Sequence, residues 1–182
     1  MSSLVDQALQ RQRLLQPSDT PTEAAHARGI LRLLLAQDGS TTKLCEAIAK
    51  GPVTLHVLEQ RVVHAVPDEV RQALPDGGFI ERITCLAAHG QAMMDNLSYI
   101  ALEGLQPELR RDLEVGTRPI GHLLARLWVR RAFLNEAPML YERLWRAVGL
   151  ADRGASRAYC VSTPEGPRML IAETYRRGML MR

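Results

Sequence analysis

The sequence predicts an α+β fold built on an antiparallel β-sheet, and three observations lead to this prediction. Apolar residues recur with helical spacing over residues 20–48. From residue 53 onward, several runs alternate apolar and polar residues, which is typical of strands. Most of these strands are joined by turns and the helices group at one end, whereas βαβ repeats would alternate strand and helix. The 182 residues fit one domain, 1–182, with residues 1–37 as an N-terminal helical segment.

The first helix is predicted from its start signal. Thr20 can cap it, Pro21 suits the first helical position, and Glu23 stands where a capping box needs a carboxylate. Gly39 is expected to end this helix, because glycine accepts the left-handed conformation common at helix ends. A polar turn then leads into a second, short helix that contains residues 44–48.

Alternation predicts the strands, and helical spacing predicts three further helices between them. In the first strand, strict alternation places Gln60 on the face opposite Leu55 and Val57. His89-Gly90-Gln91 is expected to form the turn between the second and third strands. The predicted strands are 53–63, 79–88, 92–102, 157–162 and 169–175. The helices are 107–114, 119–124 and 139–148, while residues 126–134 fit either period.

Charge and composition favour a small acidic ligand. The formal net charge is +3 and the sequence pI is about 9.0, with arginine spread along the chain and lysine nearly absent. Nucleic-acid binders usually concentrate their positive charge on one face. Arginine suits a planar, bidentate grip on carboxylates. We therefore expect a small-molecule partner and no nucleic acid, and the sequence leaves monomer or dimer open.

Cysteine usage and hydropathy predict a cytoplasmic protein. Cys45, Cys85 and Cys160 are odd in number and far apart, which indicates free thiols in a reducing compartment. The N-terminus lacks the apolar core of a signal peptide, and no apolar run approaches a membrane span, so no membrane partner is expected. The chain has no metal-ligand constellation, phosphate loop or catalytic triad, so we expect no metal and no cofactor.

Two charged residues stand out because they interrupt apolar strands. Arg82 lies in the segment 79–86, and Glu173 lies in the segment 169–175. Charged side chains are seldom buried unless they are paired. Periodicity does not decide whether Glu81 or Arg82 points inward, because neighbours in a strand face opposite sides. The residues alone favour an exposed sheet face or a structural Arg82–Glu173 ion pair over a ligand site.

Other conspicuous residues have simpler interpretations. Trp128 and Trp145 are expected to pack against the core instead of stacking on a ligand. The adjacent pairs Arg130-Arg131 and Arg176-Arg177 are expected to be solvated charges.

Four blocks, taken in order, carry a resemblance to a known family. The first is the loop Asp38–Lys43, and the second is Arg82 in its strand, with the following turn and returning strand. The third is the segment Arg118–Leu124, and the fourth is the strand Met169–Tyr175 with Glu173. Together they span most of the chain from residue 38. In the order and residue types of these blocks, the chain resembles the chorismate pyruvate-lyase (4-hydroxybenzoate synthase) family.

The resemblance implies a curved antiparallel sheet with helices covering one side and an internal ligand pocket. It implies a cofactor-independent carbon–oxygen lyase of aromatic acid biosynthesis, which converts chorismate to 4-hydroxybenzoate and pyruvate and is inhibited by its retained product. Arg82 would bind the ring carboxylate through charge-assisted hydrogen bonds, and Glu173 would lie near the phenolic oxygen, both as catalytic residues. The matching substrate-binding positions in the cover are Thr41, Thr42, Ile120, Gly121, His122 and Leu123.

Departures from the family pattern leave the substrate open. Thr41 stands where the family often has a large apolar residue, and the alignment puts Leu97 where it has an arginine. Arg131 and Arg157 are then the candidates for the second carboxylate, although each also fits a solvated arginine. A sister enzyme acting on another carboxylated ring is therefore an alternative. Another is a non-enzymatic binding module for an aromatic acid, because the family's fold is similar to the effector-binding domain of some bacterial transcription regulators.

Overall fold

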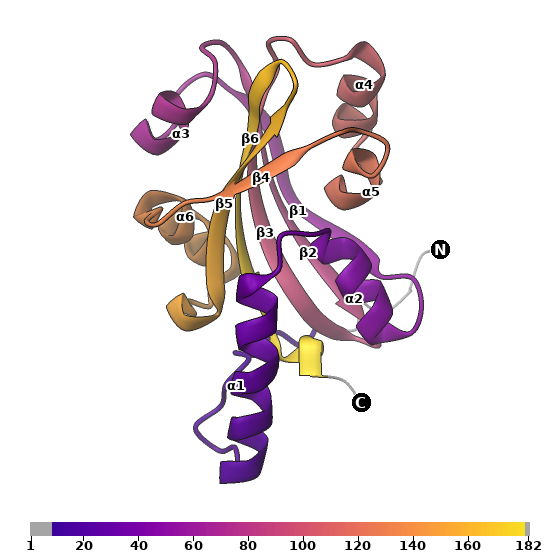
Figure 1. Ribbon diagram of the computed structural model, residues 1–182, viewed down its shortest axis with the longest axis vertical. Coiled ribbons are helices and arrows are strands. Elements are labelled where there is room, and N and C mark those ends of the chain that lie inside the picture. The colour runs from indigo at the N-terminus through magenta and orange to yellow at the C-terminus, as the bar shows by residue number, and fades with distance from the viewer. Residues whose placement is uncertain (1–8, 181–182) are drawn as a thin grey trace, which may run out of the picture.

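The computed structural model describes residues 9–180 and contains one six-stranded, open antiparallel sheet. The strand order across the sheet is β1-β2-β3-β6-β5-β4, and the sheet curves along its length (Figure 1). This arrangement confirms the predicted α+β fold. The strands are β1 (Thr54–Val63), β2 (Phe79–Ala88), β3 (Gln91–Ala101), β4 (Arg130–Phe133), β5 (Ser156–Thr163) and β6 (Gly166–Tyr175).

Six α-helices and two short 3₁₀ helices accompany the sheet in the described residues. The α-helices are α1 (Pro21–Ala36), α2 (Thr41–Ala49), α3 (Asp68–Ala73), α4 (Pro107–Val115), α5 (Ile120–Leu124) and α6 (Pro138–Val148). The 3₁₀ helices are η1 (Arg153–Ala155) and η2 (Arg177–Leu180). Helix α3 was not predicted, although Pro67 and the two acidic residues after it are a start signal. Within residues 9–180, no helix combines the length and apolar character that a bilayer crossing needs.

The two faces of the sheet carry separate apolar clusters, and helices cover both. On one face, α1, α2, α4 and α5 pack over the sheet (Figure 1). On the other face, α3 and α6 cover a second cluster that includes Phe79, Ile83 and Leu97. Alternation along β2 therefore sends Arg82 and Thr84 to the first face and Ile83 to the second.

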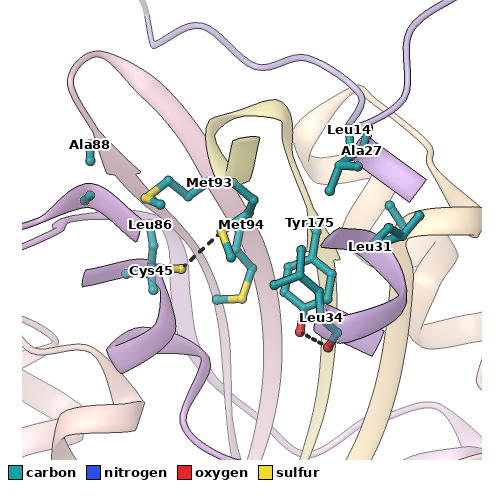
Figure 2. Packing of buried hydrophobic residues seen from close by; sticks show 13 residues of the cluster. Leu14, Ala27, Leu31, Leu34, Cys45, Leu86, Ala88, Met93, Met94 and Tyr175 are labelled. Carbon is teal, nitrogen blue, oxygen red and sulfur yellow. Dashed lines mark hydrogen bonds between the residues drawn. The ribbon is translucent and has the colours of Figure 1, made fainter. Parts of the chain in front are cut away.

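Figure 2 shows the cluster beneath α1 and α2, where sulfur-containing and aliphatic side chains fill the space above the sheet. Leu31 and Leu34 come from α1, and Cys45 comes from α2. The Cys45 thiol lies 3.7 Å from the Met179 sulfur, and the Tyr175 hydroxyl donates to the Leu34 carbonyl at 3.1 Å. The cluster thus joins both helices to β6 and η2.

The end of α1 differs from the prediction. The capping box at its start is present, but the helix ends at Ala36 and not at Gly39. The carbonyls of Leu34 and Gln37 accept hydrogen bonds from the buried Arg157 guanidinium, the first at 3.0 Å. The last carbonyls of a helix lack partners inside it, and here the sheet supplies donors that make a glycine cap unnecessary.

The predicted helical segment 1–37 is helical only in its second half within the described residues, because residues 9–20 form no helix. Gln10 makes an isolated parallel bridge to Gln91, and Arg13 makes an antiparallel bridge to Arg176. This segment is therefore held by backbone pairing against the start of β3 and the end of β6, two inner strands of the sheet. The first eight residues of the predicted segment lie outside the described range.

A buried ion cluster fixes the same segment. Asp95 on β3 is fully buried and accepts from Arg11 Nε at 3.0 Å and from Arg176 Nε at 2.6 Å. Arg176 is also fully buried, so its prediction as a solvated charge is wrong. The sequence showed an arginine pair at the end of a strand but gave no sign of a carboxylate 81 residues away.

A β-bulge between Val57 and Glu59 changes the facing of β1. Val57 pairs with Thr84 and Gln60 pairs with Arg82, so Gln60 lies on the same face as Val57 and Leu55. The prediction of opposite faces is wrong because one extra residue in a strand shifts the alternation. Gln60 then donates to the last-turn carbonyls of α4 at 2.9 and 3.1 Å. It fixes that helix over the face of the sheet that carries Arg82 and Thr84, which we call the pocket face.

The ambiguous stretch 126–134 contains the short edge strand β4. Trp128, just before it, is 69% exposed, so the prediction that it packs in the core is wrong. Trp145 does pack, as expected. Its ring stacks on Tyr141, and its indole N–H donates to Thr174 at 3.0 Å.

Candidate functional site

A cavity of about 40 Å³ lies between the pocket face of the sheet and the helices α2 and α5. Its polar lining residues are Ser40, Thr41, Thr42, Arg82, Thr84, Asn96, Arg131, Tyr159 and Glu173. Its apolar lining includes Leu55, Leu86, Met94, Ile120, Leu124 and Ile171. The predicted site residues Arg82, Glu173, Thr41, Thr42, Ile120 and Gly121 therefore meet around one space.

Strand register explains how the sheet brings its polar residues together. Thr84 on β2 pairs with Asn96 on β3, Asn96 pairs with Glu173 on β6, and Glu173 pairs with Arg157 on β5. These four side chains form one row across the sheet. Arg82 lies two residues before Thr84 on β2, on the same face, and pairs with Ser98. The cavity floor thus contains a row of polar side chains, and Arg82 is the diagonal neighbour of Asn96 in the middle of that row.

Arg82 is a buried cation that has no acidic partner among residues 9–180. The side chain is 0% exposed, and its Nη2 donates to the carbonyls of Gly116 at 2.7 Å and Arg118 at 3.2 Å. Its Nε and Nη1 groups have no hydrogen-bond partner among residues 9–180. Burial lowers the pKa of this guanidinium, and no nearby carboxylate offsets the effect. These two nitrogen atoms therefore remain available as donors to an anionic ligand.

Glu173 is paired with Arg157 and not with Arg82, so the alternative of an Arg82–Glu173 ion pair is wrong. Its Oε2 atom accepts from Arg157 Nε and from Thr41 Oγ1, each at 3.0 Å, and lies 3.3 Å from the Tyr175 hydroxyl, whose one hydrogen is closer to the Leu34 carbonyl. Its Oε1 atom accepts from the Tyr159 hydroxyl at 2.7 Å. Burial, followed by the charge of Glu173, raises the pKa of Tyr159 well above its ordinary value, which keeps that hydroxyl a donor.

Arg157 is buried, which corrects the interpretation of a solvated arginine. All its nitrogen atoms donate to the protein: Nε to Glu173, Nη2 to Thr41, and Nη1 to two carbonyls at the end of α1. Three aromatic rings surround the guanidinium at 5.3 to 5.5 Å from their centroids. Arg157 therefore holds Glu173 in place and is not among the residues that line the cavity.

Arg131, the other candidate for a second carboxylate, does line the cavity. Its Nη1 group donates to the Asp38 carbonyl at 3.3 Å. Its Nε group is buried and has no partner in the part of the chain that the structure describes. The cavity therefore has a second unsatisfied guanidinium donor at its β4 side.

The cover over the cavity is a close contact between α2 and α5. A Cβ atom at Gly121 would lie 2.4 Å from Thr42 Oγ1 and 2.8 Å from Ser40 Oγ, so only glycine allows this approach. His122 does not line the cavity but joins the same two helices, because its Nε2 atom lies 2.8 Å from Glu46 Oε1. Leu123 also lies away from the cavity, in the apolar cluster beneath α4 and α5.

The alignment of Leu97 with a site arginine is not supported by its orientation. Leu97 faces the α6 side and is fully buried there. Its neighbours Asn96 and Ser98 face the other side, where the Ser98 hydroxyl donates to Asn96 Oδ1 at 2.7 Å. Sequence reasoning missed Asn96 and Thr84 at the cavity. Their signal was polar residues at alternate positions of two neighbouring apolar strands.

Within residues 9–180, no group of three or more His, Cys, Asp or Glu side chains could hold a metal ion.

Comparison with known proteins finds no matching family model and no matching curated protein. A gene product of Staphylococcus aureus subsp. aureus N315 is similar at 14% identity, over 70% of this chain and 86% of that one, with a TM-score of 0.46. The ligand-binding domain of a putative GntR-family transcriptional regulator from Bordetella bronchiseptica is 17% identical, over 69% and 83% of the chains, with a TM-score of 0.41.

The C-terminal domain of the histidine utilization repressor from Pseudomonas syringae pv. tomato is 10% identical, over 68% of this chain and 91% of that one, with a TM-score of 0.42. At these TM-scores and identities, the similarities are too distant to transfer a ligand or an activity to this chain.

Proposed function

We propose that this chain binds a small aromatic carboxylic acid in the cavity, with Arg82 as the anchor for the carboxylate. One observation carries the proposal: a fully buried guanidinium lines the cavity, and two of its nitrogen atoms have no hydrogen-bond partner within residues 9–180. Leaving a buried charged donor unsatisfied is costly. A carboxylate would accept two charge-assisted hydrogen bonds in the geometry that arginine favours.

The remaining walls suit an aromatic ring. Leu86 and Met94 from the sheet and Ile120 and Leu124 from the cover supply apolar surface around the polar groups. Small-molecule sites commonly combine such apolar walls with a few polar groups that fix orientation. The ring would lie between sheet and cover, with its carboxylate toward Arg82.

A ligand of this size requires the cover to move. The cavity of about 40 Å³ holds about three water molecules, at roughly 10–15 Å³ each. A benzoate ring is larger than that space. Helix α5 has five residues and meets α2 through the Gly121 contact, so we expect the ligand to enter by separation of these two helices.

Binding is tested by calorimetry and thermal unfolding with 4-hydroxybenzoate, benzoate and 4-hydroxybenzamide. The two acids should bind and raise the Tm, since a ligand that binds only the native state adds about 2.7 kcal/mol at one hundred times its Kd. The amide has nearly the same shape but lacks the negative charge, so it is the matched control and should bind much more weakly. Equal affinity for amide and acid, or no binding of either, would refute a carboxylate site at Arg82.

Catalysis by the same site is a second candidate function, namely chorismate pyruvate-lyase activity. The observation that favours it is the placement of Arg82, Glu173 and the unpaired Arg131 Nε around one cavity. Chorismate has two carboxylates, so Arg82 would take the ring carboxylate and Arg131 the second one. The reaction breaks the C3–O bond, so that enolpyruvate leaves and becomes pyruvate, and it removes the proton from C4, which keeps its hydroxyl. Orientation with acid–base help suits this elimination.

Hydrogen bonds from Arg157, Thr41 and Tyr159 hold both carboxylate oxygen atoms of Glu173, so we assign it the role of orienting the substrate. Incubation with chorismate alone, monitored for pyruvate and 4-hydroxybenzoate, tests this activity. Isochorismate in parallel tests the sister-enzyme alternative, and Arg82→Met protein is the control for uncatalysed breakdown. Binding of 4-hydroxybenzoate without pyruvate release from either substrate would leave the binding module as the function.

A further inference from the structure

Asn96 occupies the centre of the cavity floor. It lies on β3 between Thr84 and Glu173 in register, and its side chain is buried where it lines the cavity. The amide is neutral and has two N–H donors and one acceptor oxygen. It is therefore placed to contact the middle or far end of a ligand anchored on Arg82.

The orientation of this amide is fixed by Ser98. The Ser98 hydroxyl is fully buried and donates to Asn96 Oδ1 at 2.7 Å. The acceptor end of the amide is thereby engaged within the sheet, and its Nδ2 hydrogens remain for the cavity. Without Ser98, the two ends of the amide would be free to exchange places.

Glu173 supplies an acceptor beside this donor. Its Oε2 atom accepts hydrogen bonds from Arg157 and Thr41, whereas Oε1 accepts one, from Tyr159. A carboxylate oxygen has about two acceptor sites, so Oε1 has capacity for a further donor. Asn96 and Glu173 are direct cross-strand neighbours, so an N–H donor and an oxygen acceptor lie together at one place in the cavity.

We propose that Asn96, positioned by Ser98, is a specificity-determining residue that selects a ring hydroxyl on the bound acid. A hydroxyl both accepts and donates one hydrogen bond, so it satisfies Asn96 Nδ2 and Glu173 Oε1 together. Neither an unsubstituted ring nor a methoxy group does both. This inference rests on the proposed function, since it requires the carboxylate of the same ligand to lie on Arg82.

The spacing along the strands agrees with such a ligand. Arg82 pairs with Ser98, and Asn96 lies two residues further along β3, on the same face. Diagonal neighbours of this kind are roughly 7–8 Å apart. The two side chains are therefore neighbours on one face, so one ring that carries a carboxylate and a hydroxyl can contact both.

The test compares dissociation constants of 3- and 4-hydroxybenzoate with those of benzoate and the matching methoxybenzoates, measured by calorimetry. The wild type should bind at least one hydroxybenzoate about tenfold or more tightly than benzoate and than its methoxy analogue. Asn96→Leu should bring the ratio between hydroxybenzoate and benzoate close to one. Ser98→Ala, which removes only the positioning hydroxyl, should reduce the ratio by a smaller factor.

Each outcome decides the matter. If the wild type binds benzoates but Asn96→Leu keeps the same ratio, Asn96 does not read the hydroxyl, and the carboxylate site stands without it. Loss of all acids by Asn96→Leu would assign Asn96 to the general shape of the cavity and overturn the inference. If that variant fails to fold by circular dichroism, an unchanged ratio in Ser98→Ala overturns it instead. A wild type that binds none of the acids refutes the proposed function and the inference together.

Discussion

Glu81 and Arg82 are consecutive residues of β2, both are buried, and they meet opposite conditions on the two faces of the sheet. On the α6 face, the Glu81 carboxylate accepts from Arg61 at 2.8 Å, Arg143 at 2.8 Å and the Tyr99 hydroxyl at 2.6 Å. On the pocket face, Arg82 meets two backbone carbonyls and no carboxylate, and two of its N–H groups are unpaired within residues 9–180.

This difference separates a charge that stabilises the fold from a charge kept for a ligand. Burying an ion costs several kcal/mol, and the protein recovers that cost only when partners satisfy it. Glu81 has such partners from β1, β3 and α6, so the free protein already offsets its burial. The cost of burying Arg82 is offset only in part, and an anion in the cavity would supply the missing interaction.

The largest expected effect comes from removing the anchor. Arg82→Met keeps most of the side-chain volume and removes the guanidinium, so the affinity for 4-hydroxybenzoate should fall by about two to four powers of ten. This estimate assumes two lost charge-assisted hydrogen bonds at roughly 1.5–3 kcal/mol each. The stability of the free protein should change little, because an uncompensated buried charge disappears. Calorimetry gives the Kd, and urea unfolding gives the stability.

The matched control removes an arginine from the other face. Arg143→Met should lower the free energy of unfolding, because Glu81 loses one of its partners, while the Kd for 4-hydroxybenzoate stays within twofold of wild type. If both variants lost stability and kept their affinity, the two arginines would be equivalent structural residues, and the distinction between the faces would be wrong.

A smaller effect is expected when the charge of Glu81 is removed from its cluster of hydrogen-bond partners. Glu81→Gln keeps the shape but removes the charge that balances Arg61 and Arg143. Loss of one partner from a buried ion pair costs roughly 3–5 kcal/mol. Here the side chains of Arg61 and Arg143 are 59% and 19% exposed, so water offsets part of the loss, and we expect about 2–3 kcal/mol. Urea unfolding measures it, and an unchanged midpoint would contradict the proposed structural role.

How far the sequence predicted these two sites depended on the range of the interactions. Local signals placed the start of α1 at Thr20 and the bounds of β2 at 79–88 correctly, since capping and alternation act between near neighbours. Arg82 and Glu173 stood out as charges in apolar strands. Their partners did not, because periodicity does not say which residue of a distant strand will lie opposite.

The errors have the same origin. Arg157 and Arg176 looked solvated because their carboxylate partners lie 16 and 81 residues away. Asn96 and Thr84 escaped notice because a polar residue at every second position is also typical of a solvated sheet face. Only the cover by α2 and α5, set by tertiary packing, turns that face into a cavity floor.

Acid titration tests the contribution of the Glu81 carboxylate to stability in the wild type. Burial alone would raise the pKa of Glu81, but hydrogen bonds from Tyr99, Arg143 and Arg61 hold it below the ordinary value of 4.5. A carboxylate with a lowered folded-state pKa contributes stability that is fully present above pH 4.5 and is lost as the pH falls toward the folded-state value. The wild type should therefore lose more stability between pH 6 and pH 3.5 than Glu81→Gln does. Parallel slopes for the two proteins would show that Glu81 is not a source of the acid sensitivity.

The smallest expected effect concerns the contact between His122 and Glu46, which joins the two helices of the cover. His122 and Glu46 approach to 2.8 Å, but their side chains are 34% and 27% exposed, and an exposed pair contributes about 1 kcal/mol or less. His122→Gln should therefore leave the Tm almost unchanged. If the ligand leaves by separation of α5 from α2, the dissociation rate of 4-hydroxybenzoate should rise by up to about fivefold, since a weaker contact favours the open cover.

Stopped-flow displacement measures this rate, and Glu46→Gln should raise it by a similar factor. In the double variant the two increases should not multiply, because both substitutions remove the same contact. An unchanged rate in both single variants would place the route of entry elsewhere, while leaving the contrast between Glu81 and Arg82 intact.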